Sequence, residues 1–161
     1  MPLPLQPIYT AEQRRRRDET HWTLVQGILA PLQFVVFLVS AWLVLRYLFT
    51  GVGELSATVS IVIKTLILYT IMVTGAIWEK VVFGKYLFAK AFFWEDVFSM
   101  LVLSLHTAYL YALFTGALGV RGQMLLALAA YTAYVINAGQ FVLKLRAARL
   151  AGDIPEPGVA P

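Results

Sequence analysis

Four long apolar runs alternate with short polar segments along this chain, at residues 24–49, 55–77, 97–118 and 123–141. Each run can form a helix that crosses a hydrocarbon core of about 30 Å, which takes about 20 residues. The runs are continuously apolar, whereas the strands of a membrane β-barrel alternate in polarity. The pattern therefore predicts an all-α fold: an integral membrane bundle of four transmembrane helices.

The segments outside these runs complete a single membrane domain, with an N-terminal segment at 1–23, the bundle at 24–143 and a tail at 144–161. Residues 11–23 fit a polar helix at the membrane interface, with Thr10 and Gln13 forming a capping box. Pro31 is expected to kink the first span. Residues 1–10 contain three prolines and show no helical periodicity, and the proline-rich tail after Leu150 is expected to be frayed.

Composition excludes several classes of protein. Apolar residues make up 60% of the chain and charged residues 14%, which is unusual for a soluble domain. There is no cysteine, which rules out disulfides and thiolate chemistry. The sequence has no Gly-rich phosphate loop and no HExxH motif, and His21 and His106 alone make a poor metal site.

The basic residues predict the orientation of the bundle. If four helices alternate, ten of the 13 Lys and Arg residues fall on the side of the two termini and the central loop. Arg46 and Arg121 fall on the other side. The positive-inside rule then places both termini in the cytoplasm. The cations do not form one continuous patch, so nucleic-acid binding is not expected.

Polar residues inside the spans are the first candidates for function, because an ionisable group in lipid costs a few kcal/mol. They include Lys64, Asn137 and Gln140. At about 100° per residue, one stripe of the third span should face the bundle interior. That stripe comprises Glu95, Ser99, Val102, His106 and Tyr109.

The connector between the second and third spans, residues 78–96, gathers charged and aromatic residues. Connectors in helical bundles usually have about two to eight residues. We therefore predict an aromatic, charged cytoplasmic loop that acts as an interfacial lid over a flat hydrophobic ligand.

Each of these residues also has a structural interpretation. Glu95 or Asp96 can cap a helix, and Glu79 with Lys80 can be an interfacial ion pair. His106 can be an interhelical hydrogen-bond partner, and Lys64 can snorkel toward the outer interface. An interfacial belt explains the aromatic residues equally well: Trp78, Phe92, Phe93 and Trp94.

Five stretches of the chain resemble the 2-vinyl bacteriochlorophyllide hydratase family of phototrophic bacteria. The likeness extends from Tyr9 to Leu150 and includes the charged aromatic connector. The stretches are "YTAEQRRRRDETHWTLVQ", "LAPLQFVVFLVS", "VIKTLILYTIMVTGAIWEKVVFGKYLF", "AFFWEDVFSMLVLSLHTAYL" and "GQMLLALAAYTAYVINAGQFVLKLR". The resemblance implies a hydro-lyase of a bacterial inner membrane that converts the 3-vinyl group of chlorophyllide a, or of 3-vinyl bacteriochlorophyllide a, to a 1-hydroxyethyl group.

That reaction requires a protonated carboxylic acid, a base for water and an apolar slot for the ring, but no redox cofactor. The candidates are Glu79, Glu95 and Asp96. We expect Glu95 to be the acid because it shares a helical face with His106. Glu79 would then activate water, and Asp96 would cap the helix.

Further residues are candidates for substrate binding. His106 is a possible axial ligand of the substrate magnesium, and Lys80 or Lys85 can pair with the free propionate. The ring would contact Trp78, Phe93, Trp94, Tyr109 and Asn137. Expected partners are the pigment, the lipid bilayer and other enzymes of bacteriochlorophyll biosynthesis. A non-catalytic pigment carrier or assembly protein and a proton-coupled transporter that uses Lys64 are the alternatives.

Overall fold

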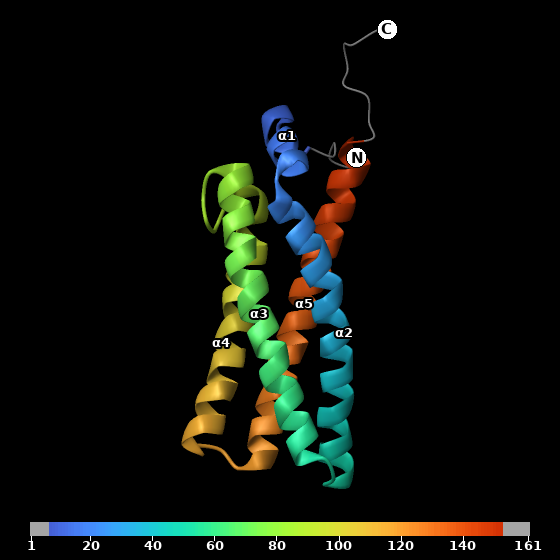
Figure 1. Cartoon of the computed structure of the whole chain (residues 1–161), viewed down its shortest axis with the longest axis vertical. Coiled ribbons are helices and arrows are strands. Elements are labelled where there is room, and N and C mark those ends of the chain that lie inside the picture. Colours follow the sequence, from blue (N-terminus) through green and yellow to red (C-terminus); the bar gives the residue numbers. More distant parts are fainter. Residues whose placement is uncertain (1–6, 153–161) are drawn as a thin grey trace, which may run out of the picture.

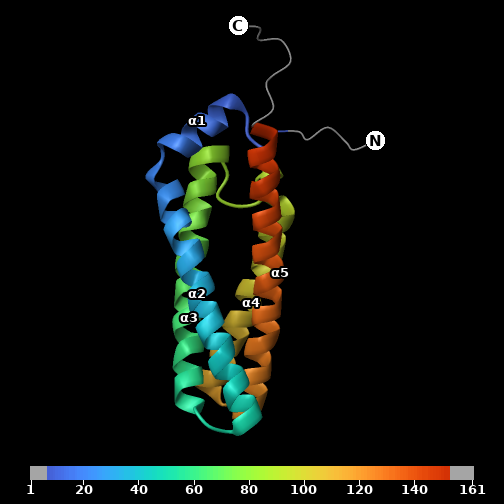
Figure 2. The same cartoon turned by 90° about the vertical axis from the view of Figure 1, so that its right-hand side faces the viewer.

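The computed structural model describes residues 7–152, in which four long helices run up and down beside one another (Figures 1 and 2). The tail that was expected to be frayed lies largely outside the described residues, which also exclude residues 1–6. The elements are α1 (Ala11–Glu19), α2 (His21–Thr50), α3 (Glu54–Phe83), the 3-10 turn η1 (Lys90–Phe92), α4 (Phe93–Thr115) and α5 (Val120–Gly152).

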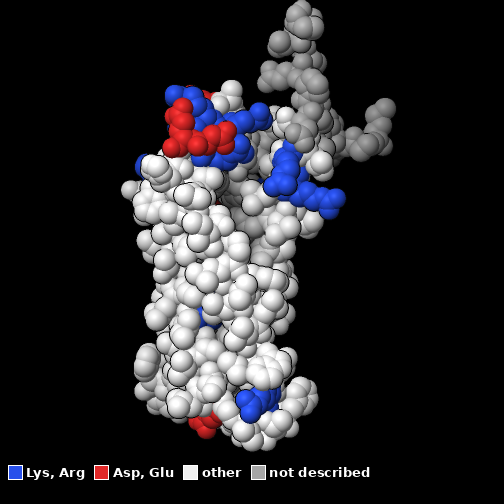
Figure 3. All heavy atoms as spheres, turned by 45° about the vertical axis from the view of Figure 1, so that its right-hand side comes forward, with Lys and Arg blue, Asp and Glu red and all other residues white. Residues whose placement is uncertain are grey.

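Helices α2 to α5 are all long and apolar enough to cross a membrane, which confirms the predicted all-α class and four spans. A helix of 30 residues, such as α2 or α3, is about 45 Å long. It therefore extends well beyond a hydrocarbon core of about 30 Å. The surface view agrees, because charged residues gather at the two ends of the molecule and the middle is almost uncharged (Figure 3).

The N-terminal helix is shorter than predicted. The capping box of Thr10 and Gln13 is present, with the Gln13 N–H donating to Thr10 Oγ1. The chain does not remain helical to residue 23, because Thr20 is extended (φ −82°, ψ 137°) and caps α2 through Trp22 N–H. Residues 11–23 therefore belong to two helices, which meet at Thr20.

The predicted long connector at 78–96 is wrong in extent. Helix α3 continues to Phe83 and ends at Gly84, whose φ of 86° favours glycine. Only residues 84–89 lie between α3 and η1, because Trp78 and Glu79 belong to α3 and Glu95 and Asp96 to α4. Most of the residues expected to form a lid therefore belong to α3, η1 or α4.

Helix α5 also exceeds its predicted end, because it extends to Gly152 and includes the first part of the expected tail. The chain thus forms two antiparallel hairpins, α2–α3 and α4–α5. Their connecting turns lie at one end of the bundle, and the α3–α4 connection and α1 lie at the other (Figure 1).

Small residues let the hairpins pack closely near the two turns. Ala57 of α3 and Ala127 of α5 are fully buried there, and Ala130 is 1% exposed. Small side chains at helix contacts allow backbones to approach closely within a membrane. The other end of the bundle has a smaller hydrophobic core around Tyr9, Val82 and Phe92, and it also contains a cavity.

Candidate active site

A cavity of about 1090 Å³ occupies the end of the bundle nearest α1. Small-molecule sites usually have about 300–1,000 Å³, so this cavity suits a large ligand. All four long helices, α1 and the connector residue Leu87 contribute to its wall. The wall is largely apolar, and its only carboxyl groups among the described residues are those of Glu79 and Asp96.

These two carboxyl groups face each other across the α3–α4 contact. Both side chains are buried and lie within hydrogen-bonding range of one another. Glu79 Oε1 accepts a 2.6 Å hydrogen bond from Ala89 N–H, and Asp96 Oδ2 accepts a 2.9 Å bond from Phe88 N–H. Each carboxyl group therefore holds the connector through one oxygen and retains a second oxygen.

The connector is strained where the carboxyl groups hold it. Phe88 has a φ of 61°, which is uncommon for a residue with a side chain. Asp96 and Glu79 bind the N–H groups of Phe88 and of the residue that follows it. Asp96 was predicted to cap α4, but this prediction is wrong. The N-cap of α4 is Phe92, which makes no side-chain cap bond.

Glu95 lies beside this pair but does not line the cavity. Its Oε1 atom is 3.3 Å from Lys144 Nζ of α5, so the carboxylate already has a counter-ion. Asn137 Nδ2 donates to the Glu95 carbonyl, and Ser99 Oγ donates to Asn137 Oδ1. Asn137 contributes to the cavity wall while it joins α4 to α5.

The stripe that contains His106 faces inward as its helical phase predicts, and of its members Ser99 lines the cavity. His106 and Tyr109 are fully buried and neither lines the cavity. His106 Nδ1 is 2.8 Å from the Val102 carbonyl, which can only accept, so Nδ1 carries the proton. His106 Nε2 has no partner among the described residues.

Lys64 does not snorkel to an interface, because its side chain is fully buried. The Nζ atom lies 3.7 Å from the centroid of the Tyr134 ring, which is a cation–π arrangement. No described residue forms a hydrogen bond with this ammonium group. Tyr134 separates it from the cavity that the same ring lines.

The predicted substrate-binding aromatic residues divide into two groups. Trp78 lines the cavity and donates from Nε1 to Thr23 Oγ1 at 2.9 Å. Phe93 and Trp94 are outside it, with 43% and 71% of their surfaces exposed, as interfacial residues would be. Aromatic residues that were not predicted also line it: Tyr9, Phe34 and Phe141.

Neither predicted lysine lines the cavity. Lys80 Nζ donates to the Gly84 carbonyl at 3.0 Å, so it caps the end of α3. Lys85 is exposed on the connector. The cations at the cavity wall are arginines.

The sequence analysis missed a polar stripe on α2. Gln26, Gln33 and Ser40 are spaced by seven residues and therefore share a helical face. Gln26 Nε2 donates to Thr74 Oγ1 at 2.6 Å, and Ser40 is hydrogen-bonded to Tyr131. Gln26 and Gln33 line the cavity. Their regular spacing within an apolar run was the available signal.

Comparisons with known proteins identify relatives that cover most of the chain. Residues 9–147 match the family model described as 2-vinyl bacteriochlorophyllide hydratase. The relative of that name in Rhodobacter capsulatus is 68% identical over 151 residues, which cover 94% of this chain and 88% of the relative. The one in Cereibacter sphaeroides is 71% identical over 148 residues, which cover 91% of each chain.

No solved structure matches the chain significantly. The matched region includes α2, α3 and α4, most of α5 and both of the cavity-lining carboxyl groups in the described part of the chain. The chain belongs to the 2-vinyl bacteriochlorophyllide hydratase family.

Proposed function

We propose that this protein adds water to the 3-vinyl group of chlorophyllide a, or of 3-vinyl bacteriochlorophyllide a, in bacteriochlorophyll biosynthesis. Family membership supports the reaction. The observation that carries the site assignment is the Glu79–Asp96 pair in the wall of a large apolar cavity. The cavity would hold the macrocycle, and the pair would carry out the proton transfers.

The chemistry needs two proton transfers and one new carbon–oxygen bond. One carboxyl group of the pair, in its protonated form, gives its proton to the terminal vinyl carbon. The positive charge left on the inner carbon is delocalised into the macrocycle. Water then bonds to the inner carbon, and the other carboxylate removes its extra proton. The product is the 1-hydroxyethyl group, and no oxidant or reductant is consumed.

Direct contact between the two carboxyl groups would let the site return to its starting state. After one turnover the proton has moved from the acid to the base. Two adjacent carboxylates repel each other, so the pair retains one proton. That proton forms a hydrogen bond between the two carboxyl groups. A proton passed across the pair therefore restores the acid without a third residue.

This assignment differs from the one expected from helical phase. Glu95 is paired with Lys144 and lies outside the cavity wall, so Asp96 replaces it as the partner of Glu79. His106 is also not expected to ligate the substrate magnesium, because the cavity does not reach its Nε2 atom. Trp78 and Asn137 remain candidates for contact with the ring.

We further propose that the protein lies in the bacterial inner membrane with both termini in the cytoplasm and α1 at the interface. The basic residues at the α1 end support this orientation (Figure 3). Because the chain has no cysteine, single cysteines report their side directly. Cysteines at Val52 and Ala117 should react with a periplasmic reagent, and one at Lys85 should not. Reaction of only the cysteine at position 85 would indicate the opposite orientation.

Conversion of the pigment tests the proposed function. Membranes that contain the protein are incubated with chlorophyllide a in water enriched in heavy oxygen, and the pigment is analysed by mass spectrometry. A gain of one water that carries the heavy oxygen supports the hydratase. Binding of the pigment without conversion would support a carrier instead.

A further inference from the structure

The cavity wall contains charged groups of both signs, which come from different helices. The carboxyl pair of Glu79 and Asp96 lies on α3 and α4. The cations come from the extremities of the described chain: Arg14 and Arg17 of α1, and Arg149 near the end of α5. An otherwise apolar cavity therefore has an acid–base pair inside and guanidinium groups at its mouth.

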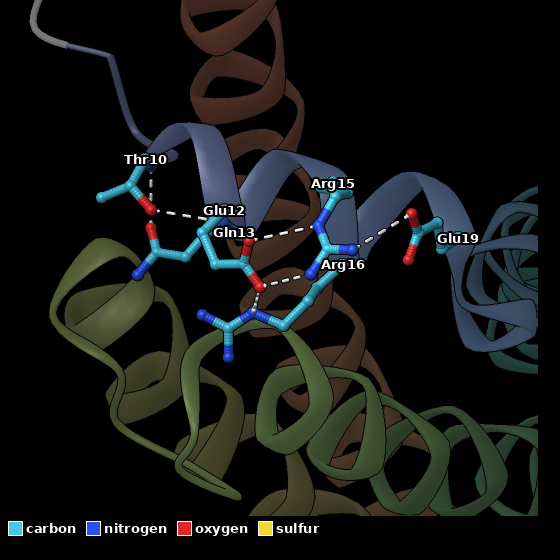
Figure 4. A network of polar contacts seen from close by, with 6 residues as sticks. All are labelled: Thr10, Glu12, Gln13, Arg15, Arg16 and Glu19. Atoms are coloured by element: carbon cyan, nitrogen blue, oxygen red, sulfur yellow. Dashed lines mark hydrogen bonds and ion pairs between the residues drawn. The ribbon is translucent and has the colours of Figure 1, made fainter.

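Most of the arginines on α1 already have partners. Arg15 pairs with Glu12 at 2.8 Å and lies 3.7 Å from Glu19, and Arg16 lies 3.8 Å from Glu12 (Figure 4). These contacts follow the helix, so they stabilise α1 and leave little charge for a ligand.

Arg17 also has partners within the protein. Its guanidinium lies 2.8 Å from Asp18 and 4.7 Å from the centroid of the Tyr9 ring. Burial raises the pKa of the Tyr9 hydroxyl, and the nearby Arg17 charge opposes this shift only in part. Tyr9 therefore stays neutral, and its ring packs against the Arg17 guanidinium.

Arg14 and Arg149 differ from these residues. Neither makes an ion pair with any residue between 7 and 152, and both are exposed where they line the mouth. The Arg14 guanidinium lies close to the end of α5, 3.7 Å from where a Cβ atom would stand on Gly152. Helices α1 and α5 thus bring two guanidinium groups, neither of which has an ion-pair partner among residues 7–152, to one opening.

The spacing along α5 suits one bound molecule. Asn137 of α5 accepts a hydrogen bond from Ser99, which lies about one helical turn after Asp96 in α4. Arg149 lies twelve residues after Asn137 along α5. Twelve helical residues span about 18 Å, and the Arg149 side chain leans back toward the N-terminus of its helix. A ring whose reactive edge meets the carboxyl pair can therefore extend an acidic arm to the mouth.

We propose that Arg14 and Arg149 form a carboxylate-binding site that holds the propionate of a de-esterified tetrapyrrole. This inference rests on the proposed function, and it replaces Lys80 and Lys85 as the propionate partners. Guanidinium groups bind carboxylates through paired hydrogen bonds, which orient the ligand as well as attract it. The site would therefore select free acids over esters.

The test compares chlorophyllide a with its propionate methyl ester. The test variant is Arg14→Gln/Arg149→Gln. The matched control is Arg15→Gln/Arg146→Gln, which removes the same charge from the same helices at positions that do not line the cavity. For each protein, KM and kcat are measured with both pigments in membranes, and helix content is measured by circular dichroism.

The wild-type protein should show a lower KM for the acid than for the ester. A charge-assisted hydrogen bond corresponds to about tenfold in affinity, so the test variant should lose about tenfold or more for the acid and little for the ester. Its kcat should remain near the wild-type value. The control should keep the preference. If the double variant folds poorly, Arg149→Gln alone should still lose part of it.

Three results would overturn the inference. They are an equal KM for acid and ester in the wild type, an unchanged preference in the test variant, or an equal loss in the control. Conversion of neither pigment by the wild type would instead refute the proposed function itself. The two failures are therefore distinguishable.

Discussion

Replacement of Glu79 by glutamine should abolish most hydration while it keeps the fold. The amide retains an oxygen that can accept the 2.6 Å hydrogen bond from Ala89 N–H, so the connector stays anchored. The amide nitrogen can also donate to Asp96. The loss of charge at one hydrogen bond should cost about 1 kcal/mol of stability.

The effect on turnover should be much larger. Loss of a general acid or base typically lowers the rate by about 10²- to 10⁴-fold. At about 1.4 kcal/mol per factor of ten, this raises the barrier by about 3–5 kcal/mol. Asp96→Asn should behave in the same way, because both members of the pair are needed in each turnover. Product is measured by mass spectrometry, and pigment binding by fluorescence.

Glu95→Gln is the matched control. It removes a carboxylate one position from Asp96, but outside the cavity wall. The Glu95 side chain is only 10% exposed, but the Lys144 side chain is 33% exposed and can be hydrated, so loss of the ion pair should cost about 1 kcal/mol. Turnover should stay within a few-fold of the wild type. A Glu79→Gln protein that hydrates at the normal rate, or a Glu95→Gln protein that is inactive although it binds pigment, would refute the assignment.

Three further variants test the packing. Lys64→Met should raise the thermal midpoint in detergent, because a buried ammonium without a carboxylate costs several kcal/mol and the contact with Tyr134 returns only about 2 kcal/mol; a lower midpoint would contradict this. Ala130→Leu should destabilise the bundle by about 1–3 kcal/mol through overpacking, whereas the exposed Thr132→Leu should not, and equal effects would argue against a close helix contact. Ala138→Trp, in the cavity wall, should weaken pigment binding by about tenfold or more at unchanged helix content; unchanged affinity would place the pigment elsewhere.

The membrane architecture could be predicted from the sequence because hydropathy alone determines it. The lipid bilayer disfavours polar groups, which leaves four long apolar runs in the sequence. The capping box at Thr10 could be predicted because it depends only on neighbouring residues. The ends of the helices were less predictable. Helix α3 continues past Ile77 through Trp78, Glu79 and Lys80, because charged residues extend a helix readily once it leaves the hydrocarbon core.

The site could be predicted only in part. The carboxyl groups were identified because charges are rare in this chain, but their pairing depends on how α3 and α4 meet. Helical phase identified the inward face of Glu95 without showing that Lys144 would approach it from α5. Contacts between distant segments decide such partners, and no local pattern specifies them.

The strained connector is best explained by the site that it closes. A positive φ at Phe88 costs free energy and persists only where neighbouring contacts hold it. Those contacts come from Asp96 and Glu79, each of which accepts a hydrogen bond from a connector N–H through one carboxyl oxygen. The connector therefore fixes the distance between the carboxyl groups, and the carboxyl groups fix the connector. A local rule is broken where the proposed chemistry requires two acids to stay in contact.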